Sequence, residues 1–212
     1  MWFFGSNEFQ YESLPDLKDK VILITGGTAG LGKQSAIELL KKNATIIITA
    51  RNEEKGKLAV ADILEKTNNQ NPNISFGVMD QGDLTSVRAF ADWFLKLNVP
   101  LNVLMLNAGI AVVPFKMIDG LESHFYVNHM SHFLLVKLLL EKIKQTPASR
   151  VVFVSSDAHQ IVRETPDWEV YSKYNYEDSM TGSFHQYGIS KLANIQTALV
   201  LTRRLADENV YV

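Results

Sequence analysis

The sequence predicts an α/β fold in which a doubly wound parallel sheet lies between layers of helices. Two observations predict it: apolar, β-branched runs alternate along the chain with amphipathic stretches of helical length, and the first run ends in a cluster of glycines. A chain of 212 residues, 46% of them hydrophobic, is long enough for one substantial core. We therefore expect one domain over residues 20–212, preceded by an N-terminal extension over residues 1–19.

The expected elements follow one another in a regular order. Residues 21–24 are continuously apolar, as in a strand buried on both faces, and residues 31–42 after them are amphipathic. This alternation predicts parallel strands joined by helical crossovers. Sheets of this kind bind ligands at the carboxyl ends of their strands. The further strands are expected over residues 44–50, 74–79, 101–106 and 150–155, and the further helices over residues 53–66, 84–97, 120–144 and 183–206. Residues 209–212 resemble the start of a sixth strand, so the chain is either a fragment or shortened form, or one that stops unusually early.

The composition argues against several classes of function. The 21 basic and 23 acidic residues nearly balance, which leaves no electrostatic footprint for nucleic acid, so a small-molecule partner is expected. The absence of cysteine excludes disulfides, cysteine-ligated zinc and thiol nucleophiles, and it fits an intracellular protein, cytoplasmic or peripheral on an intracellular membrane. No metal site is expected, because the five histidines form no H-E-x-x-H pair and His129 and His132 lie in an apolar helix, where packing roles are commoner.

The first four residues, MWFF, are apolar and aromatic, but polar residues follow at once. The stretch is too short for a membrane span or for the apolar part of a signal peptide. It either packs against the fold or acts as a weak membrane tether. The sequence leaves both alternatives open, and it also leaves open whether the chain forms a homo-oligomer.

A glycine-rich turn, TGGTAGLG over residues 25–32, joins the first expected strand to the first helix. Glycines permit a tight turn and bring backbone N–H groups and a helix N-terminus against phosphate, so we expect a nucleotide here. Two alternatives remain open. Residues 27–33 also match the G-x-x-x-x-G-K motif of NTPases, although Gln34 stands where Ser or Thr would bind magnesium. The other alternative is a glycine turn without a ligand.

The end of the second expected strand bears on the choice of nucleotide. An acidic residue there would hydrogen-bond a ribose 2′-hydroxyl and repel a 2′-phosphate, whereas this chain has Arg51 followed by Asn52. A guanidinium pairs with phosphate in bidentate geometry, so NADP(H) is favoured over NAD(H). The alternative is that Arg51 merely faces solvent, and Glu53 and Glu54 nearby weaken the attraction for phosphate.

Tyr187 and Lys191 stand four positions apart in the last expected helix, and therefore on one face of it. An isolated tyrosine titrates at about pH 10, but a neighbouring cation favours the phenolate. The pair thus provides what hydride transfer needs, a group that takes a proton from an alcohol or returns one to an alkoxide. Taken alone, the pattern arises often by chance and is more typical of a surface pair on a helix.

Three motifs in order along the chain resemble those of the short-chain dehydrogenases/reductases: the glycine turn (T-G-x-x-x-G-x-G), residues 107–109 (N-A-G), and the Tyr187/Lys191 pair (Y-x-x-x-K). The resemblance covers about residues 20–212 and implies a Rossmann-like three-layer αβα fold. Residues 47–52, 127–135 and 154–159 resemble the retinol-dehydrogenase-like and WW-domain-oxidoreductase-like branch most. That branch implies a bulky apolar alcohol, aldehyde or ketone as substrate, such as a retinoid, a steroid or a lipid-derived carbonyl.

The resemblance also implies roles for individual residues. Tyr187 would be the general acid/base, and Lys191 would lower its pKa and bond the nicotinamide ribose. Ser156 would hold the substrate oxygen, unless Ser155 takes that role, and Asn128 would hold a relay water, unless it caps a helix kink. Cofactor contacts are expected from Gly26, Thr28, Gly30, Leu31, Gly32, Arg51, Asn52, Asp80, Gln81, Asn107, Ala108, Gly109, Tyr187 and Lys191, with Gln81 contributing its backbone only.

One departure from the family bears on function. The family continues past a further strand into a proline-glycine turn and helices that cover the substrate, whereas this sequence ends at Val212. The alternative function is therefore a catalytically silent nucleotide-binding or interaction protein. The segment between Ser156 and Tyr187 either walls an apolar pocket or packs as a surface insertion, and its aromatic residues are Trp168, Tyr171, Tyr174, Tyr176 and Phe184.

Overall fold

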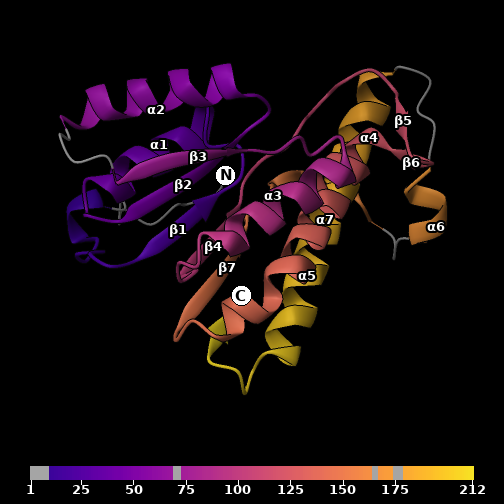
Figure 1. Cartoon of the computed structure of the whole chain (residues 1–212). Coiled ribbons are helices and arrows are strands. Elements are labelled where there is room, and N and C mark those ends of the chain that lie inside the picture. The colour runs from indigo at the N-terminus through magenta and orange to yellow at the C-terminus, as the bar shows by residue number, and fades with distance from the viewer. Residues whose placement is uncertain (1–9, 69–72, 164–166, 174–178) are drawn as a thin grey trace.

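The structure, a computed structural model, describes residues 10–68, 73–163, 167–173 and 179–212, apart from the side chain of Tyr171. Within these residues, six strands form one parallel sheet in the order β3-β2-β1-β4-β7-β8. The chain therefore winds outward from β1 in both directions, with helices on both faces (Figure 1). The predicted doubly wound parallel fold is confirmed.

The elements lie close to their predicted positions. The strands of the sheet are β1 (Val21–Ile24), β2 (Thr45–Ala50), β3 (Ile74–Val78), β4 (Val103–Leu106), β7 (Ser149–Phe153) and β8 (Val210–Tyr211). The longer helices are α1 (Gly30–Leu40), α2 (Glu53–Thr67), α3 (Leu84–Lys96), α5 (Ser131–Lys144) and α7 (Met180–Arg204). The shorter elements are the 3-10 helices η1 (Tyr11–Ser13) and η3 (Asp157–Ile161), the helices α4 (Ser123–Phe125) and α6 (Trp168–Tyr171), the π turn η2 (Tyr126–Met130), and the strands β5 (Met117–Ile118) and β6 (Leu121–Glu122).

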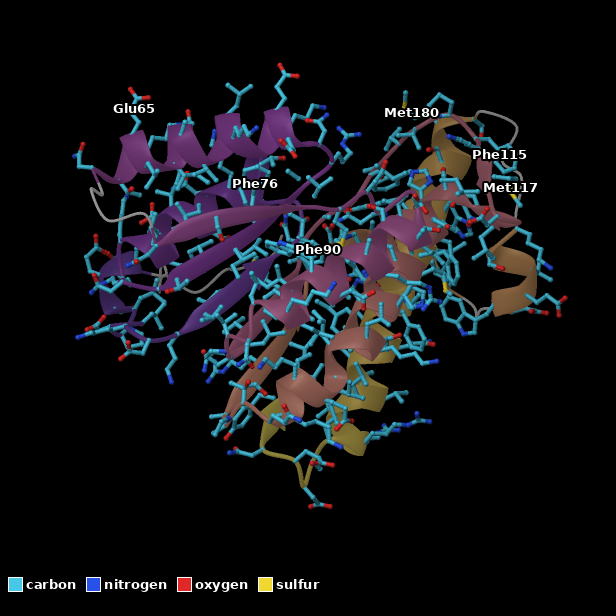
Figure 2. The ribbon with its side chains drawn as sticks, viewed as in Figure 1. Glu65, Phe76, Phe90, Phe115, Met117 and Met180 are labelled. Atoms are coloured by element: carbon cyan, nitrogen blue, oxygen red, sulfur yellow. The ribbon has the colours of Figure 1, made fainter. Side chains whose placement is uncertain are left out.

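The core has two halves, one on each face of the sheet. In β1, Val21 and Leu23 belong to the cluster formed with α3 and α5, whereas Ile22 and Ile24 belong to the cluster formed with α1 and α2. This alternation explains why β1 is apolar without interruption, since both of its faces are covered. Figure 2 shows the same division further along the sheet, with Phe76 on the side of α2 and Phe90 on α3.

The predicted helix over residues 120–144 is wrong at its start. β5 and β6 form an antiparallel hairpin, and its turn holds Asp119 (φ 49°) and Gly120 (φ 79°) in left-handed conformations that a helix does not contain. Helix begins at Ser123, because the carboxylate of the preceding Glu122 accepts hydrogen bonds from the first free N–H groups. The π turn η2 then separates α4 from α5.

The residues just before β1 are tied to the turn between α1 and β2. The backbone N–H of Leu17 donates to the carbonyl of Lys42 at 2.7 Å, and the amide of Asn43 donates to the carboxylate of Asp16 at 2.9 Å. The aromatic residues 2–4, expected either to pack on the fold or to tether it to a membrane, lie outside the described residues. Across the described ranges, no helix combines the length and apolar character that crossing a bilayer requires.

Candidate active site

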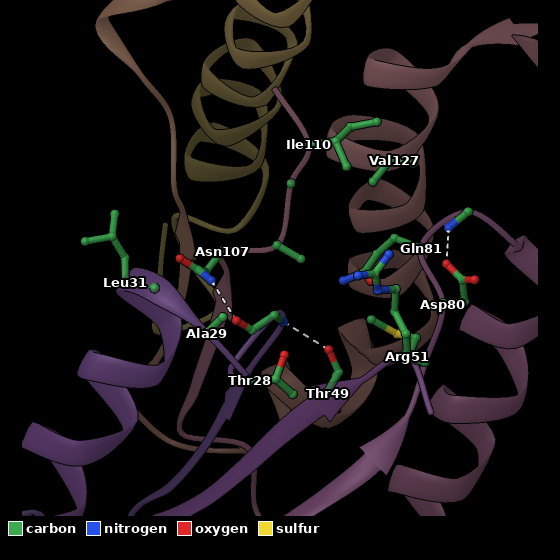
Figure 3. Close-up of a pocket in the computed structure, with 16 residues that line it drawn as sticks. Thr28, Ala29, Leu31, Thr49, Arg51, Asp80, Gln81, Asn107, Ile110 and Val127 are labelled. Atoms are coloured by element: carbon green, nitrogen blue, oxygen red, sulfur yellow. Dashed lines mark hydrogen bonds between the residues drawn. The ribbon is translucent and has the colours of Figure 1, made fainter. Parts of the chain in front are cut away.

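A cavity of about 480 Å³ opens at the carboxyl ends of β1, β2, β3 and β4. Figure 3 shows its wall, to which four loops contribute. The lining residues are Gly26, Thr28, Ala29, Gly30 and Leu31 after β1, Thr49 and Arg51 at β2, residues 79–82 after β3, residues 107–110 after β4, and Val127. The fold thus brings ten of the predicted cofactor residues to one site: Gly26, Thr28, Gly30, Leu31, Arg51, Asp80, Gln81, Asn107, Ala108 and Gly109.

The glycine turn adopts a conformation that side chains would hinder. Gly26 has a φ of 68°, and a Cβ on it would lie 2.9 Å from the Cα of Ala108. Gly30 also has positive φ, but no atom lies within 4 Å of the place of its Cβ. Gly26 is therefore needed for close packing, while Gly30 is needed for backbone conformation and keeps the cavity floor open.

Gly32 lies behind this floor rather than in the cavity wall. A Cβ on Gly32 would collide with the side-chain amide of Asn107, which donates to the carbonyl of Thr25 at 3.0 Å. Gly32 therefore lets α1 approach the turn after β4, and its contact with a cofactor stays a prediction.

The side chain of Lys33 argues against the NTPase interpretation of this turn. Its ammonium forms an ion pair with Asp62 of α2 at 2.5 Å, and Lys33 does not line the cavity. Gln34, at the magnesium-binding position of the NTPase motif, is hydrogen-bonded to Glu38 within α1. In NTPases the lysine of this motif reaches the phosphates, so the arrangement here lacks the group that this chemistry needs.

At the ends of β2 and β3, the structure separates the predicted contacts. Arg51, Asp80 and Gln81 line the cavity, whereas Asn52 does not; its side chain caps α2 by accepting the N–H of Lys55 at 2.9 Å. Gln81 is only 7% exposed, and among the described residues no acceptor lies within hydrogen-bonding distance of its Nε2. A buried, unpaired donor in a cavity wall indicates a partner supplied by a ligand.

The N-A-G turn is held by Thr25, the first residue of the glycine turn. The Thr25 hydroxyl accepts the backbone N–H groups of Asn107 and Ala108, both at 3.0 Å. Thr49 makes a comparable bond on the other side, where its hydroxyl accepts the N–H of Gly26 at 3.1 Å (Figure 3). Neither threonine was predicted, although Thr25 is the first letter of the motif that identified the turn.

Lys191 and Tyr187 lie together on α7; neither lines the cavity, but Lys191 lies behind its wall. The Lys191 ammonium is 5.5 Å from the centre of the Tyr187 ring and donates to the carbonyl of Val154 at 2.9 Å. Lys191 is 4% exposed, and burial lowers the pKa of its amine to about 8. A Cβ on Gly109 would lie 3.6 Å from the Lys191 Nζ, which places the amine directly behind a residue of the cavity wall.

The Tyr187 ring is held by aromatic neighbours. Phe184 stacks on it with ring centres 6.3 Å apart, and His124 contacts it edge-on at 6.4 Å. Trp168 packs instead on Phe125, with ring centres 6.0 Å apart, so of these two aromatics of the 156–187 segment one contacts the Tyr187 ring and the other packs elsewhere. Tyr174 and Tyr176 lie outside the described residues.

The two serines after β7 differ in their contacts. The Ser155 hydroxyl donates to the carbonyl of Lys191 at 3.0 Å and so ties β7 to α7. The Ser156 hydroxyl caps η3 by accepting the N–H of Ala158, and donates to the carboxylate of Asp157, both at 3.2 Å. Ser155 thus has a structural partner, and Ser156 makes only local, partly exposed contacts that a substrate oxygen could replace.

Asn128 uses its whole side chain to join other elements. Its Oδ1 accepts the N–H of Ile110 at 2.8 Å, and its Nδ2 donates to the carbonyl of Ile110 at 2.9 Å and to Ser190 at 3.0 Å. It lies in the π turn η2, as the kink alternative proposed. Its side-chain hydrogen bonds therefore position Ile110, the residue after the N-A-G turn, and its role in holding a relay water stays a prediction.

The described ranges contain no group of three or more His, Cys, Asp or Glu side chains arranged to hold a metal ion. His129 of the π turn is buried and bonds Asn194 of α7, and His132 of α5 is buried and bonds Thr25, which follows β1. Both side chains are part of the packed interior.

Comparison with known proteins agrees with this geometry. The model of the short chain dehydrogenase family matches residues 20–173. Human retinol dehydrogenase 11 is 38% identical over 203 residues, which cover 93% of this chain and 60% of that protein. The oxidoreductase CalI of Penicillium decumbens is 44% identical over 199 residues, which cover 91% of this chain and 56% of that protein. The chain thus spans about 60% of the length of such relatives.

Among solved structures, that of an uncharacterized protein from Mycobacterium paratuberculosis is similar to this chain, with a TM-score of 0.78 and 32% identity. The match covers 95% of this chain and 69% of that one.

Proposed function

Because the chain belongs to the short-chain dehydrogenase family, we propose that it is an NADP(H)-dependent oxidoreductase that interconverts an alcohol and an aldehyde or ketone. One observation carries the proposal: Gly109 lines the cavity and lies next to the Lys191 ammonium. The cavity and the Tyr187/Lys191 pair are therefore adjacent at Gly109. Proteins of this family bind NAD(P).

Three features of the cavity support a dinucleotide as its ligand. The glycine turn leaves open space at Gly30 beside the N-terminus of α1, where phosphate is favoured. Met79, Ile110 and Val127 give the cavity apolar walls, and the unpaired Nε2 of Gln81 offers a donor to a ligand acceptor. When bound, the nicotinamide cofactor supplies or accepts the hydride, and the protein supplies orientation and proton transfer.

We assign proton transfer to Tyr187. Its hydroxyl would give a proton to the forming alkoxide, or take one from an alcohol, with the Lys191 ammonium 5.5 Å from the centre of its ring. Ser156 would exchange its bond to Asp157 for one to the substrate oxygen. Asn128 would hold Ile110, and through it the turn that borders Lys191.

Substitution of Tyr187 by phenylalanine tests the assignment. Tyr187→Phe keeps the ring and its stacking on Phe184 but removes the proton donor, so turnover should fall by about 10²-fold or more, while NADPH affinity stays within about threefold. Steady-state rates with an aldehyde panel and fluorescence titration of NADPH measure the two effects. Retained turnover would refute the role of Tyr187. NADPH binding without turnover in the natural chain would support the alternative, a catalytically silent nucleotide-binding protein.

The preference for NADP(H) is supported by the guanidinium of Arg51 in the cavity wall, although Asp80 in the same wall opposes it. A lost charge-assisted bond to the 2′-phosphate corresponds to about a tenfold or larger loss of NADPH affinity. Arg51→Ala should therefore lower the NADPH/NADH affinity ratio by about tenfold, whereas Arg203→Ala, at the end of α7, should leave it unchanged. A preference for NADH that Arg51→Ala does not alter would refute the preference for NADP(H).

The side chain of Gln81 provides a separate test of nucleotide binding. Gln81→Leu removes a buried, unpaired donor, so the protein without nucleotide should lose no stability. If the amide bonds the nucleotide, the same variant should bind NADPH and NADH about tenfold more weakly. Thermal unfolding and fluorescence titration measure both effects. Unchanged affinity for both nucleotides would limit Gln81 to its backbone contact, as the sequence suggested.

We propose a bulky apolar carbonyl or alcohol as substrate. Relatives that carry the name retinol dehydrogenase support a retinoid-like molecule. A smaller cavity of about 330 Å³ reaches Phe184, which stacks on Tyr187; Ala158, Ile161 and Phe184 give it an apolar part, and Asp157, Gln160 and Arg163 complete its wall. Rates on retinal, a steroid ketone and a medium-chain aldehyde, compared with a short polar aldehyde, would test this, and a preference for the polar aldehyde would overturn it.

A further inference from the structure

We infer that His132 is a positioning residue, which links the Thr25 side of the nucleotide cavity to the π turn that carries Asn128 and so holds residues 107–110 from both ends. The inference rests on the proposed nucleotide binding for its functional readout. It assigns to His132 no contact with cofactor or substrate.

Both ring nitrogens of His132 have defined partners. Nδ1 lies 3.0 Å from the carbonyl oxygen of Asn128, and Nε2 lies 2.9 Å from the hydroxyl of Thr25. A carbonyl oxygen only accepts, so Nδ1 carries the proton, and in the neutral ring Nε2 is then the acceptor. The contacts therefore select a single tautomer, in which Thr25 donates to His132.

This direction matters for the N-A-G turn. The Thr25 hydroxyl is completely buried and already accepts the N–H groups of Asn107 and Ala108. Its own proton needs an acceptor, and the alternative, the carbonyl of Met105, is 3.5 Å away. Since the Nε2 of His132 is closer at 2.9 Å, it allows the Thr25 hydroxyl to face both amides.

The other nitrogen of His132 acts on the opposite end of the same segment. The Asn128 carbonyl accepts His132 and the amide of Asn194, at 3.0 and 3.1 Å. The Asn128 side chain then holds both backbone groups of Ile110. Residues 107–110 are thus held by Thr25 at one end and by Asn128 at the other, and His132 joins the two.

The environment of His132 keeps the ring neutral. Burial, together with the nearby Lys191 and His129, lowers the pKa of His132 to about 3 despite the opposing bond to the Asn128 carbonyl. A protonated ring would be a donor at both nitrogens and would lose the bond from Thr25. His132 therefore holds one tautomer throughout the neutral pH range, which suits a fixed link and not a proton carrier.

Three variants separate the two bonds. His132→Phe keeps the ring and removes both bonds. In His132→Asn the amide replaces Nδ1 and retains the bond to Asn128, whereas in His132→Gln the longer side chain places its amide near Nε2 and retains the bond to Thr25. His129→Phe is the matched control, because His129 is also a buried histidine of this segment but bonds Asn194 and not Thr25.

The readout is NADPH affinity by fluorescence, together with kcat on an aldehyde. We expect His132→Phe to weaken NADPH binding about tenfold, as for a lost buried hydrogen bond, with a smaller effect on kcat. His132→Gln should restore most of the affinity, and His132→Asn should not. Equal losses in His129→Phe and His132→Phe, or no loss in either, would overturn the inference.

A measurement on the natural chain covers the case in which the variants do not fold. Imidazole ¹⁵N NMR at pH 6 should show His132 as the neutral tautomer protonated at Nδ1, and a cationic ring or an Nε2-protonated ring would overturn the inference. Failure of the natural chain to bind NADPH or NADH would refute the proposed function. The tautomer of His132 would then decide the inference about this residue independently of nucleotide binding.

Discussion

At the scale of single residues, the site places a charged amine where the fold disfavours it. Lys191 is 4% exposed, lies against the Tyr187 ring and has a pKa lowered to about 8 by burial. Its hydrogen bond to the Val154 carbonyl and its nearness to Gly109 fix the position of the amine beside the cavity wall. A buried lysine of this kind indicates function at the expense of stability.

Lys191→Met should therefore stabilise the chain while it abolishes turnover. The amine is charged at pH 7, and a pKa lowered from 10.5 to about 8 corresponds to about 3 kcal/mol of unfavourable burial. Loss of the bond to Val154 offsets about 1 kcal/mol of this. We expect the free energy of unfolding, measured with urea at pH 7, to rise by about 2 kcal/mol. Lys137→Met, on an exposed position of α5, should change it by less than about 0.5 kcal/mol. A clear loss of stability in Lys191→Met would contradict this account.

At the scale of elements, the short helical region before α5 depends on one carboxylate. Glu122 is completely buried, caps α4 by accepting two backbone N–H groups, and bonds the ring of His124 at 2.8 Å. Burial alone would raise the pKa of Glu122, but the hydrogen bonds from His124 and the backbone outweigh it and hold the pKa below its ordinary value. This cap ends the β5–β6 hairpin and sets the start of the segment that carries His124 and Asn128.

Glu122→Gln should destabilise the chain by about 2 kcal/mol, because a charged acceptor of several hydrogen bonds is replaced by a neutral amide. The measurement is urea unfolding at pH 7. Glu141→Gln, whose side chain is 77% exposed in α5, is the control and should stay within about 0.5 kcal/mol of the natural chain. An equal effect in the two variants would mean that the cap contributes little.

At the scale of the whole molecule, buried neutral histidines make stability depend on pH. Burial lowers the pKa of His132 to about 3 and also lowers that of His129. An unfolded histidine titrates near pH ~6.5. Between these values the unfolded chain binds protons that the folded chain does not, so stability falls as the pH decreases below about 6.5.

Urea unfolding at pH 7 and pH 5 tests this dependence. Each pH unit below about 6.5 should cost about 1.4 kcal/mol through His132, hence about 2 kcal/mol at pH 5. His132→Gln removes this titration. Between pH 7 and pH 5 the free energy of unfolding of the variant should therefore fall by about 2 kcal/mol less than that of the natural chain. If both chains lose the same stability, the acid sensitivity arises elsewhere.

The order of the elements and the identity of the principal motifs were accessible from the sequence, because both depend on local patterns. Periodicity decides helix or strand, and the spacing of Tyr187 and Lys191 decides that they share a helix face. The hairpin before residue 123 was missed, since its turn depends on positive φ at Asp119 and Gly120 within an otherwise apolar helical pattern.

By itself, then, the sequence determined the doubly wound sheet, the glycine turn at its carboxyl edge, and the place of the tyrosine and lysine pair. Only the tertiary structure decided which neighbour each polar group has: Lys33 bonds Asp62, Asn52 caps α2, and the Gln81 Nε2 has no hydrogen-bond partner among the described residues. The bond between Thr25 and His132 joins residues 107 positions apart. The hydrogen-bond partner and the burial of each polar side chain depend on packing between segments that are distant in the sequence. Local sequence patterns do not predict that packing.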